Sequence, residues 1–270
     1  MAPVVDPCHF CPSWARFATM DIVRPEELGP RPSNTSVRRA GSTIRKILRS
    51  PGEGTEEERD AQYLQAVEII AAYRSHYSEP MGRVEQTLRE ISTEISSGSQ
   101  ITSRLKRLPT IIKKLNRPDN TDLSRLQDIG GCRVVVGHPR ALRILEDRIR
   151  QKYGTQLDNR GRDYIVAPRP SGYRALHMIV REASSGLKIE IQLRTEIMHE
   201  WAQLVESFSS VFADDFKQEG THPVQEFMAL QSKMMAHKEN LGPMPTQDEL
   251  DKMRILGRDV RRILRSKNVT

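Results

Sequence analysis

Hydrophobic residues recur at the spacing of an α-helix in two stretches of the chain. The first stretch begins after Thr55 and ends near Tyr77, with apolar positions at Tyr63, Leu64, Val67, Ile70 and Ala71. This spacing predicts a helix, and Thr55 suits its N-cap because three glutamates follow. Pro80 ends the pattern, and a second helix is predicted through Val84, Leu88, Ile91 and Ile95.

Strand-like patterns begin further along the chain. A nearly continuous apolar run predicts a strand over 128–136, and further strands are predicted over 163–167, 175–181 and 188–194. In the last of these, apolar and polar side chains alternate as they do in a half-buried strand: Ile189, Glu190, Ile191, Gln192, Leu193, Arg194. Helices are predicted over 139–153, 195–212, 222–240 and 246–266, and partly over 101–115, after Pro109. This mixture predicts an α+β fold, with a mixed or antiparallel central sheet flanked by helices.

Changes in composition divide the chain into three predicted regions. Residues 1–54 are expected to form an irregular, basic N-terminal extension, because prolines and glycines recur there. The arginine-rich stretch 37–49 leaves open an amphipathic helix that touches RNA or a partner. Residues 55–210 form the predicted main domain, and residues 211–270 form a C-terminal helical extension.

The composition suits a water-soluble protein with a negatively charged partner. Hydrophobic residues make up 37% of the 270 residues, which is enough for one sizeable core. No apolar stretch approaches the roughly 18 residues that span a bilayer, and the N-terminus lacks an apolar signal-peptide core. We therefore expect a cytoplasmic protein with no membrane partner. The formal net charge of +7 favours nucleotides or RNA as partners, and the alternative explanation is solubility alone.

The three cysteines do not indicate a metal site or a disulfide framework. Cys8 and Cys11 form a lone C-x2-C pair around His9, whereas a zinc site needs about four ligands. Cys132 lies within an apolar run, where a small buried residue is expected.

Side chains suited to polyphosphate chemistry gather between residues 163 and 195. Tyr173, His177 and Glu190 lie there with several cations, and a site that holds polyphosphates around a metal ion needs such groups. Taken alone, the three polar groups on one face of 188–194 could equally form a solvated sheet surface. A second group of cations and a hydroxyl lies upstream, at Arg104, Lys106, Thr110 and Lys114.

These segments together resemble the synthetase domain of the RelA/SpoT family. The family pattern PK-x-x-GY-x-x-[IL]H is similar to Pro168–His177, and its E-[IV]-Q-[IL]-R-T strand is similar to Glu190–Thr195. The upstream residues reproduce R-x-K-x3-[ST]-x3-K, and Gln127–Val136 is similar to the family's D-I-x-G-x-R-V strand. The blocks occur in family order over roughly residues 55–210. The resemblance implies a nucleotidyltransferase-like fold that moves a pyrophosphate from ATP to a ribose 3′-hydroxyl with Mg²⁺.

Roles on the ATP side follow from the resemblance, residue by residue. Asp128 and Glu190 match the two carboxylates that hold Mg²⁺, and Glu190 could instead accept the proton of the attacking hydroxyl. Arg104 and Arg133 match arginines that flank adenine, because a planar guanidinium stacks on a purine. Lys106, Thr110 and Lys114 would reach the ATP phosphates, and the spacing selects Lys114 over its neighbour Lys113.

On the acceptor side, the resemblance implies a binding set of Arg169, Tyr173, His177 and Gln192. Tyr173 matches a tyrosine that stacks on the acceptor base, so its ring is expected to matter and its hydroxyl is not. His177 matches a histidine near the transferred phosphates. Arg169 stands where the family usually has lysine. Ser171 stands where guanosine-specific members often have asparagine, which puts guanine recognition in doubt.

The expected acceptor remains open between two classes. The chain resembles single-domain small alarmone synthetases, and Gln127–Arg133 and His199–Glu206 are similar to motifs of a toxic branch of that class. On that resemblance the favoured acceptor is the 3′-CCA end of tRNA, with a cognate antitoxin as a partner. The alternative is synthesis of guanosine tetra- or pentaphosphate from GDP or GTP. The last predicted helix presents several arginines that could meet an RNA backbone, or a solvated surface.

Overall fold

The computed structural model describes residues 29–49, 54–95, 98–117, 122–212 and 222–266. Cys8 and Cys11 lie outside the described residues. The chain divides into two compact units: the first comprises Met1–Val84, Ser103–Cys132 and Arg181–Glu190, and the second comprises Glu85–Thr102, Arg133–Val180 and Ile191–Thr270. No helix among the described residues is both long and apolar enough to span a membrane.

Five strands form one sheet in the order β1-β2-β5-β4-β3. The strands are β1 (Gln100–Leu105), β2 (Gly130–Val136), β3 (Leu157–Asp163), β4 (Leu176–Arg181) and β5 (Lys188–Thr195). Strands β3 and β4 are antiparallel. The predicted α+β fold with a central sheet is confirmed, and β2 and β5 are neighbours as the placement of the two carboxylates required.

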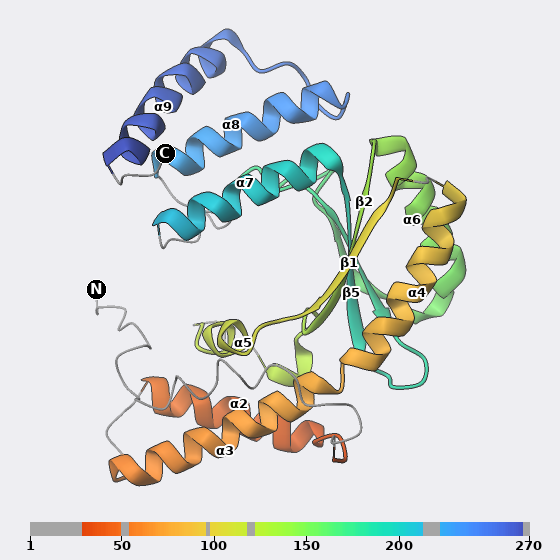
Figure 1. Cartoon of the computed structure of the whole chain (residues 1–270), viewed down its shortest axis with the longest axis vertical. Coiled ribbons are helices and arrows are strands. Elements are labelled where there is room, and N and C mark those ends of the chain that lie inside the picture. Colours follow the sequence, from red (N-terminus) through yellow and green to blue (C-terminus); the bar gives the residue numbers. More distant parts are fainter. Residues whose placement is uncertain (1–28, 50–53, 96–97, 118–121, 213–221, 267–270) are drawn as a thin grey trace. The chain divides into compact units, whose positions relative to one another are not determined.

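In the first unit, α2 (Asn34–Arg49) lies beside α3 (Glu56–Ser75) (Figure 1). The prediction of an irregular segment over 1–54 is wrong for Asn34–Arg49. Val37, Ala40 and Ile44 recur on one side of this helix and are buried, so the helix is amphipathic and its apolar side belongs to the core. Its arginine-rich side is mostly exposed, and Arg49 donates hydrogen bonds to the carbonyls of Asn116 and Arg117.

The next two helices are confirmed, but the break between them lies at His76 and Tyr77, before Pro80 and not at it. Thr55 caps α3 through a capping box, in which its hydroxyl accepts from the Glu58 amide and the Glu58 carboxylate accepts from the Thr55 amide. Helix α4 (Ser78–Ile95) follows after a short break, with Pro80 in its first turn, where a missing amide proton costs little. Helix α5 (Leu108–Leu115) begins with Pro109 in its first turn.

Two local predictions differ from the structure. Residues 100–105, left without a strand assignment, form the edge strand β1, whose side chains alternate between exposed and half-buried positions. The strand predicted over 163–167 is wrong, because β3 ends at Asp163 and a turn follows. The Asp163 carboxylate accepts from the amides of Ile165 and Val166, which bends the chain where an extended strand was expected.

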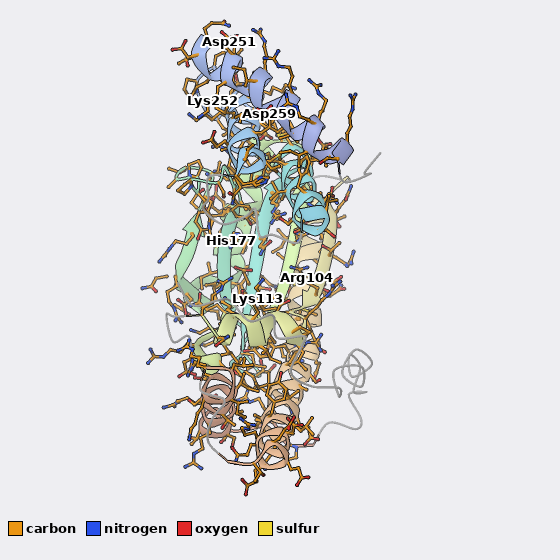
Figure 2. The ribbon with its side chains drawn as sticks, turned by 90° about the vertical axis from the view of Figure 1, so that its left-hand side faces the viewer. Arg104, Lys113, His177, Asp251, Lys252 and Asp259 are labelled. Atoms are coloured by element: carbon orange, nitrogen blue, oxygen red, sulfur yellow. The ribbon has the colours of Figure 1, made fainter. Side chains whose placement is uncertain are left out.

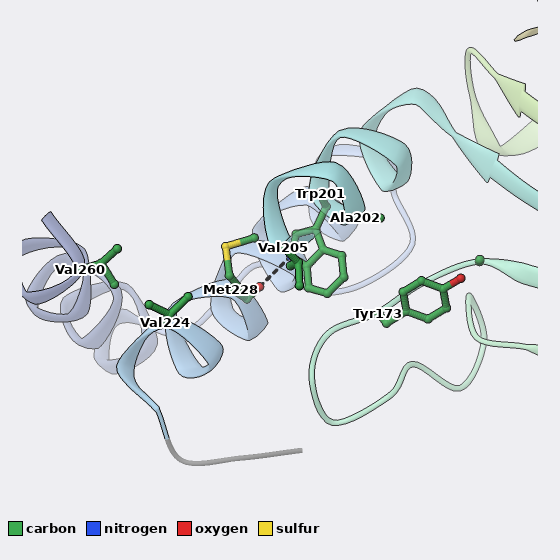
Figure 3. Packing of buried hydrophobic residues seen from close by; sticks show 8 residues of the cluster. Tyr173, Trp201, Ala202, Val205, Val224, Met228 and Val260 are labelled. Carbon is green, nitrogen blue, oxygen red and sulfur yellow. Dashed lines mark hydrogen bonds between the residues drawn. The ribbon is translucent and has the colours of Figure 1, made fainter. Parts of the chain in front are cut away.

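Helices α6 (Pro139–Tyr153), α7 (Glu196–Phe212), α8 (Pro223–Lys238) and α9 (Gln247–Ser266) belong to the second unit. Helix α7 packs on α8, and α8 packs on α9 (Figure 1). The side chains of Trp201, Met228 and Val260 join these helices in one apolar cluster, and the Trp201 indole donates to the Met228 carbonyl at 2.8 Å (Figure 3). The predicted packed face of the last helix is confirmed by the burial of Leu256 and Val260. The division at residues 54 and 210 stays a prediction.

Helix α8 also packs closely against the turn that contains Gly172. This glycine has φ +88°, and a Cβ there would lie 2.8 Å from Ser232 Cβ and 3.0 Å from Ala229 Cα. The Ser232 hydroxyl donates to the Gly172 carbonyl, and the Arg174 guanidinium donates to Ser232 Oγ at 3.3 Å. The turn before β4 is therefore fixed by a helix that lies far along the chain.

We predict that Gly172→Ala lowers the free energy of unfolding by about 3 kcal/mol, because it adds both backbone strain and a clash with α8. The matched control is Gly186→Ala, where φ is +68° but no atom lies within 4 Å of the added Cβ. Backbone strain alone should cost about 1 kcal/mol there. Urea denaturation measures both variants, and equal losses would contradict the close approach to α8.

A second prediction concerns Glu182, in the turn between β4 and β5. Its carboxylate accepts from Arg83 at 3.1 and 3.0 Å, and from the amides and hydroxyls of Ser184 and Ser185. The Arg83 hydrogen bonds, with those of the two serines, outweigh burial and hold the pKa of Glu182 far below its ordinary value of 4.5. The stability from this charge is therefore present above pH 4.5 and is lost as the pH falls below it.

We expect Glu182→Gln to lower the free energy of unfolding by about 2 kcal/mol at pH 7, because it weakens charge-assisted hydrogen bonds in a buried turn. The difference from the unsubstituted protein should shrink as the pH falls below 4.5. Glu79→Gln is the control, since Glu79 also pairs with Arg83 but is 83% exposed, and it should cost under about 0.5 kcal/mol. A pH-independent loss for Glu182→Gln would contradict the ionised carboxylate.

Candidate active site

In the first unit, Asp128 is held between two lysines. It lies two residues before β2, and its Oδ2 accepts from Lys106 Nζ at 2.8 Å. Lys114 Nζ, in the last turn of α5, lies 3.0 Å from each carboxylate oxygen. The structure therefore places Lys114 against Asp128, as the spacing argument selected, while the neighbouring Lys113 is exposed (Figure 2).

Backbone hydrogen bonds fix Lys106 where β1 ends. Its amide donates to the Ile129 carbonyl at 2.7 Å, which joins the end of β1 to the start of β2. Its own carbonyl accepts from Arg74 Nε at 2.7 Å. The Lys106 ammonium group is therefore carried by a segment tied both to the sheet and to α3.

The two lysines decide the charge of Asp128. Burial by itself raises the pKa of this carboxyl, but the charges and hydrogen bonds of Lys106 and Lys114 outweigh burial, so the pKa lies below its usual range. Asp128 is consequently ionised at neutral pH. An anion between two cations leaves a net positive charge, which suits a polyphosphate ligand.

The other predicted ATP-side residues differ in exposure. Arg104 lies on the exposed side of β1 (Figure 2), and Thr110 is exposed in the first turn of α5, so both are open to a ligand. Glu190 is half-buried on β5, between the buried side chains of Ile189 and Ile191. Arg133, in the second unit, is half-buried on β2.

The donor set of the first unit is compatible with Mg²⁺ and unsuited to a softer metal. Within the described residues, no group of three or more His, Cys, Asp or Glu side chains forms a metal site. Magnesium usually takes only one or two protein carboxylates, with water and phosphate oxygens completing its shell. Asp128, ionised and partly accessible, together with Glu190 fits that requirement by its chemistry.

In the second unit, the hydroxyl of Tyr173 lies in a group of polar side chains formed by His177, Arg194 and Gln192. Its hydroxyl lies 2.8 Å from His177 Nε2 and accepts from Arg194 Nη2 at 2.9 Å. Arg194 Nη2 also donates to Gln192 Oε1 at 3.2 Å. The structure thus brings together three members of the predicted acceptor set, through an arginine that was not in it.

Tyr173 is a core residue, which changes the expected role of its ring. It is 7% exposed, and its ring packs in the cluster around Trp201, Ala202 and Val205, with the hydroxyl pointing away from Trp201 (Figure 3). Little ring surface is left for a stacked base. The expectation that the ring and not the hydroxyl matters stays a prediction.

Tyr164 is the aromatic residue that sequence reasoning missed. Its ring is half-buried, and it lies edge-on to both Tyr173 and His177, with ring centroids 5.8 and 5.2 Å apart. The exposed guanidinium of Arg169 lies 4.6 Å from the centroid of this ring and donates to its hydroxyl at 2.9 Å. Only the presence of Tyr164 in the same segment as Tyr173 could have signalled it.

His199, on α7, lies among cations. Burial, followed by the charges of Arg133 and Arg194, lowers its pKa below 6.5, so its imidazole is neutral at neutral pH. Burial and nearby positive charge both disfavour the protonated imidazole of His199.

Comparisons with known proteins agree with this fold. A family described as the region found in RelA/SpoT proteins matches residues 103–209. The GTP pyrophosphokinase YjbM of Bacillus subtilis is 30% identical over 155 residues, which cover 54% of this chain and 70% of that protein. The GTP pyrophosphokinase of Escherichia coli is 27% identical over 143 residues, but these cover only 17% of its length.

Solved structures show the same fold. The small alarmone synthetase 1 of B. subtilis bound to its product pppGpp superposes with a TM-score of 0.51 at 22% identity, over 61% of this chain and 89% of that one. A GTP pyrophosphokinase family protein of Streptococcus pneumoniae gives a TM-score of 0.50 at 24% identity, over 61% and 86%. This protein is an enzyme of the pyrophosphokinase class. The chain belongs to the RelA/SpoT family.

Proposed function

We propose that this enzyme transfers the pyrophosphate of ATP to the ribose 3′-hydroxyl of a guanosine nucleotide, GDP or GTP, in the cytoplasm. The observation that supports the transfer most directly is the ionised Asp128 held between Lys106 and Lys114. These three groups supply a carboxylate for a metal and two cations for phosphates, each fixed by a different element of the first unit.

The reaction forms one bond and breaks one bond at the β-phosphorus of ATP. The acceptor's 3′-oxygen attacks that phosphorus, the bond to the α-phosphate oxygen breaks, and AMP leaves. Charge develops on phosphate oxygens, so catalysis depends on alignment and electrostatic stabilisation. Lys106 and Lys114 would bind these oxygens, and Thr110 would add a hydroxyl. Glu190, on β5, would either accept the proton of the 3′-hydroxyl or help Asp128 to hold the metal.

Asp128 and Glu190 are the residues that would hold Mg²⁺. When bound, the ion neutralises charge on the phosphates and orients them. In the structure Asp128 orients the two lysine ammonium groups by itself, so its substitution affects cation placement as well as the metal. The exposed Arg104 would stack on adenine, and the resemblance implies the same role for the half-buried Arg133.

The acceptor assignment rests on the relatives. YjbM and the E. coli protein are named GTP pyrophosphokinases, and the synthetase of similar fold is bound to pppGpp. Ser171, at the position where guanosine-specific members often have asparagine, is 7% exposed, and its Oγ is buried without a hydrogen-bond partner among the described residues. Base recognition through Ser171 is therefore not expected, and the exposed Arg169, which lies over the half-buried ring of Tyr164, is the alternative.

A second candidate acceptor, the 3′-CCA end of tRNA, is favoured by one observation. Helix α9 buries Leu256 and Val260 and leaves a row of arginines exposed: Arg254, Arg258, Arg261, Arg262 and Arg265. Asp251 and Asp259, labelled with Lys252 in Figure 2, pair with Arg254 and Arg262, so the charge of the face is only partly neutralised. Such a face suits an RNA backbone, and an antitoxin would be the partner of an enzyme of that kind.

We predict that Asp128→Ala and Glu190→Ala each lower AMP release at least about 100-fold, because each removes a carboxylate from the reacting centre. The assay uses ATP with GDP, and circular dichroism checks that the variants are folded. Asp147→Ala, an exposed carboxylate on α6, is the control and should retain full activity. Near-full AMP release by either variant would refute the assignment.

A further prediction separates the two acceptors. With ATP labelled at its terminal phosphate, we expect label on GDP or GTP and none on tRNA. Arg258→Gln/Arg261→Gln/Arg265→Gln on α9 should then behave like its matched control on α6, Arg140→Gln/Arg148→Gln/Lys152→Gln. Label on tRNA, weakened and made less salt-dependent by the α9 variant alone, would replace the guanosine proposal with the second candidate.

A further inference from the structure

The exposed guanidinium of Arg169 is held at two points by one aromatic residue. Its Cζ lies over the ring of Tyr164, 4.6 Å from the ring centroid, and its Nη2 donates to the Tyr164 hydroxyl at 2.9 Å. An exposed arginine without such contacts samples many rotamers, and ordering it on binding costs free energy. The cation over the ring and the hydrogen bond therefore place this guanidinium before a ligand arrives.

The backbones of both residues are also fixed. The Tyr164 amide, directly after β3 ends, donates to the Ala175 carbonyl at 2.9 Å. The Arg169 amide donates to the Tyr173 carbonyl at 3.2 Å, and the Arg169 carbonyl accepts from the Gly172 amide at 2.8 Å, which closes a tight turn. The place of the guanidinium is thus set by the fold of the second unit.

The contact with Tyr164 leaves most of the donors of Arg169 available. A guanidinium has five N–H groups in one plane and no acceptor. Among the described residues, the hydrogen bond to Tyr164 is the one that this side chain makes, and no carboxylate pairs with it. Nη2 carries two protons, one beside Nε–H and one beside Nη1–H. Whichever of the two the hydroxyl receives, the other edge of the guanidinium keeps a complete pair of parallel donors.

A pair of parallel donors fits a group that offers two acceptors in one plane. In a guanosine nucleotide, O6 and N7 of the base form such a pair, and arginine is a side chain that matches it. Adenine has an amino group in place of O6, so one donor would face another donor. Phosphate oxygens also accept from a guanidinium, but lysine binds phosphate as a point charge without any planar pair.

Two features of the turn favour the base over phosphate as the ligand of Arg169. Lysine, which the family usually has at this position, cannot present two donors in one plane, whereas arginine can. The Oγ of Ser171 is buried, so this side chain does not reach a base. The planar donor pair of Arg169 lies in the same turn and would supply a base contact that Ser171 does not.

We propose that Tyr164 is a positioning residue, which holds the Arg169 guanidinium so that its free pair of donors binds O6 and N7 of guanine and selects a guanosine acceptor. This contact rests on the proposed function and names the part of the acceptor that Arg169 recognises. Tyr164 acts through Arg169 alone, by its ring and its hydroxyl.

Nucleotide analogues test the contact in the unsubstituted enzyme, with ATP as donor and kcat/KM for the acceptor measured by AMP release. 7-Deaza-GDP lacks N7 and should be used about 10-fold less efficiently than GDP, and ADP at least about 10-fold less efficiently. Equal use of GDP and 7-deaza-GDP would overturn the proposal and leave the proposed function intact. AMP release with tRNA but with neither GDP nor GTP would refute the proposed function and the guanine contact together.

Arg169→Lys keeps the charge and removes the planar pair. We expect kcat/KM with GDP to fall about 10-fold, mainly through KM, and the preference for GDP over 7-deaza-GDP to fall to about 1. Arg140→Lys, at an exposed arginine of α6, is the matched control and should change neither value. If Arg169→Lys lowers the use of both nucleotides and keeps the preference, the guanidinium binds phosphate and the proposal is wrong.

Two substitutions of Tyr164 test its positioning role. Tyr164→Phe removes the hydrogen bond and keeps the ring, so the preference for GDP over 7-deaza-GDP should fall from about 10 to about 4. Tyr164→Leu removes both contacts and should lower the preference to about 1, with kcat changed less than about threefold. A merely structural role would affect both nucleotides alike, so an unchanged preference would overturn the proposal. Should Tyr164→Leu fold poorly, Tyr164→Phe decides the same question.

Discussion

The charge balance around Asp128 is the constraint on which the first unit depends. One carboxylate satisfies two lysines that come from the end of β1 and the end of α5, and it lies where β2 is about to begin. Without the lysines, burial would raise the pKa of this carboxyl; without the carboxylate, two ammonium groups would repel each other. The arrangement explains how a short cationic motif becomes a set of groups with fixed positions.

In the second unit, packing between helix α8 and the turn before β4 takes the place of charge pairing. Helix α8 lies beyond the residues that match the family, yet its Ser232 holds the turn at Gly172, and its Met228 carbonyl accepts from Trp201 beneath Tyr173. The turn at Gly172 and the ring of Tyr173 therefore depend on packing supplied by the C-terminal helices. This coupling gives α8 and α9 a structural reason to be present, whichever acceptor the enzyme uses.

The burial of Tyr173 could not be read from its sequence motif. In the sequence it is an aromatic residue after glycine, and stacking is the obvious use of its ring. In the structure the ring is an apolar anchor against Trp201, and the polar end carries the interactions. The exposed planar surface belongs to Arg169, supported by the ring of Tyr164.

The sequence by itself determined most of the helices after residue 55 and the strands around Asp128 and Glu190, because periodicity is a local property of the chain. Lys114 was singled out over Lys113 by the spacing of the family motif that the segment resembles. The sequence did not determine β1, α2 or the turn after Asp163, where edge-strand pairing, a packed apolar side and a carboxylate-capped turn override weak local signals. Only the tertiary structure decided that Arg194 and the ring of Tyr173 are buried. Alternation along β5 places Arg194 on the polar side with Glu190, but burial depends on what covers that side, and the covering residues come from segments distant in the chain.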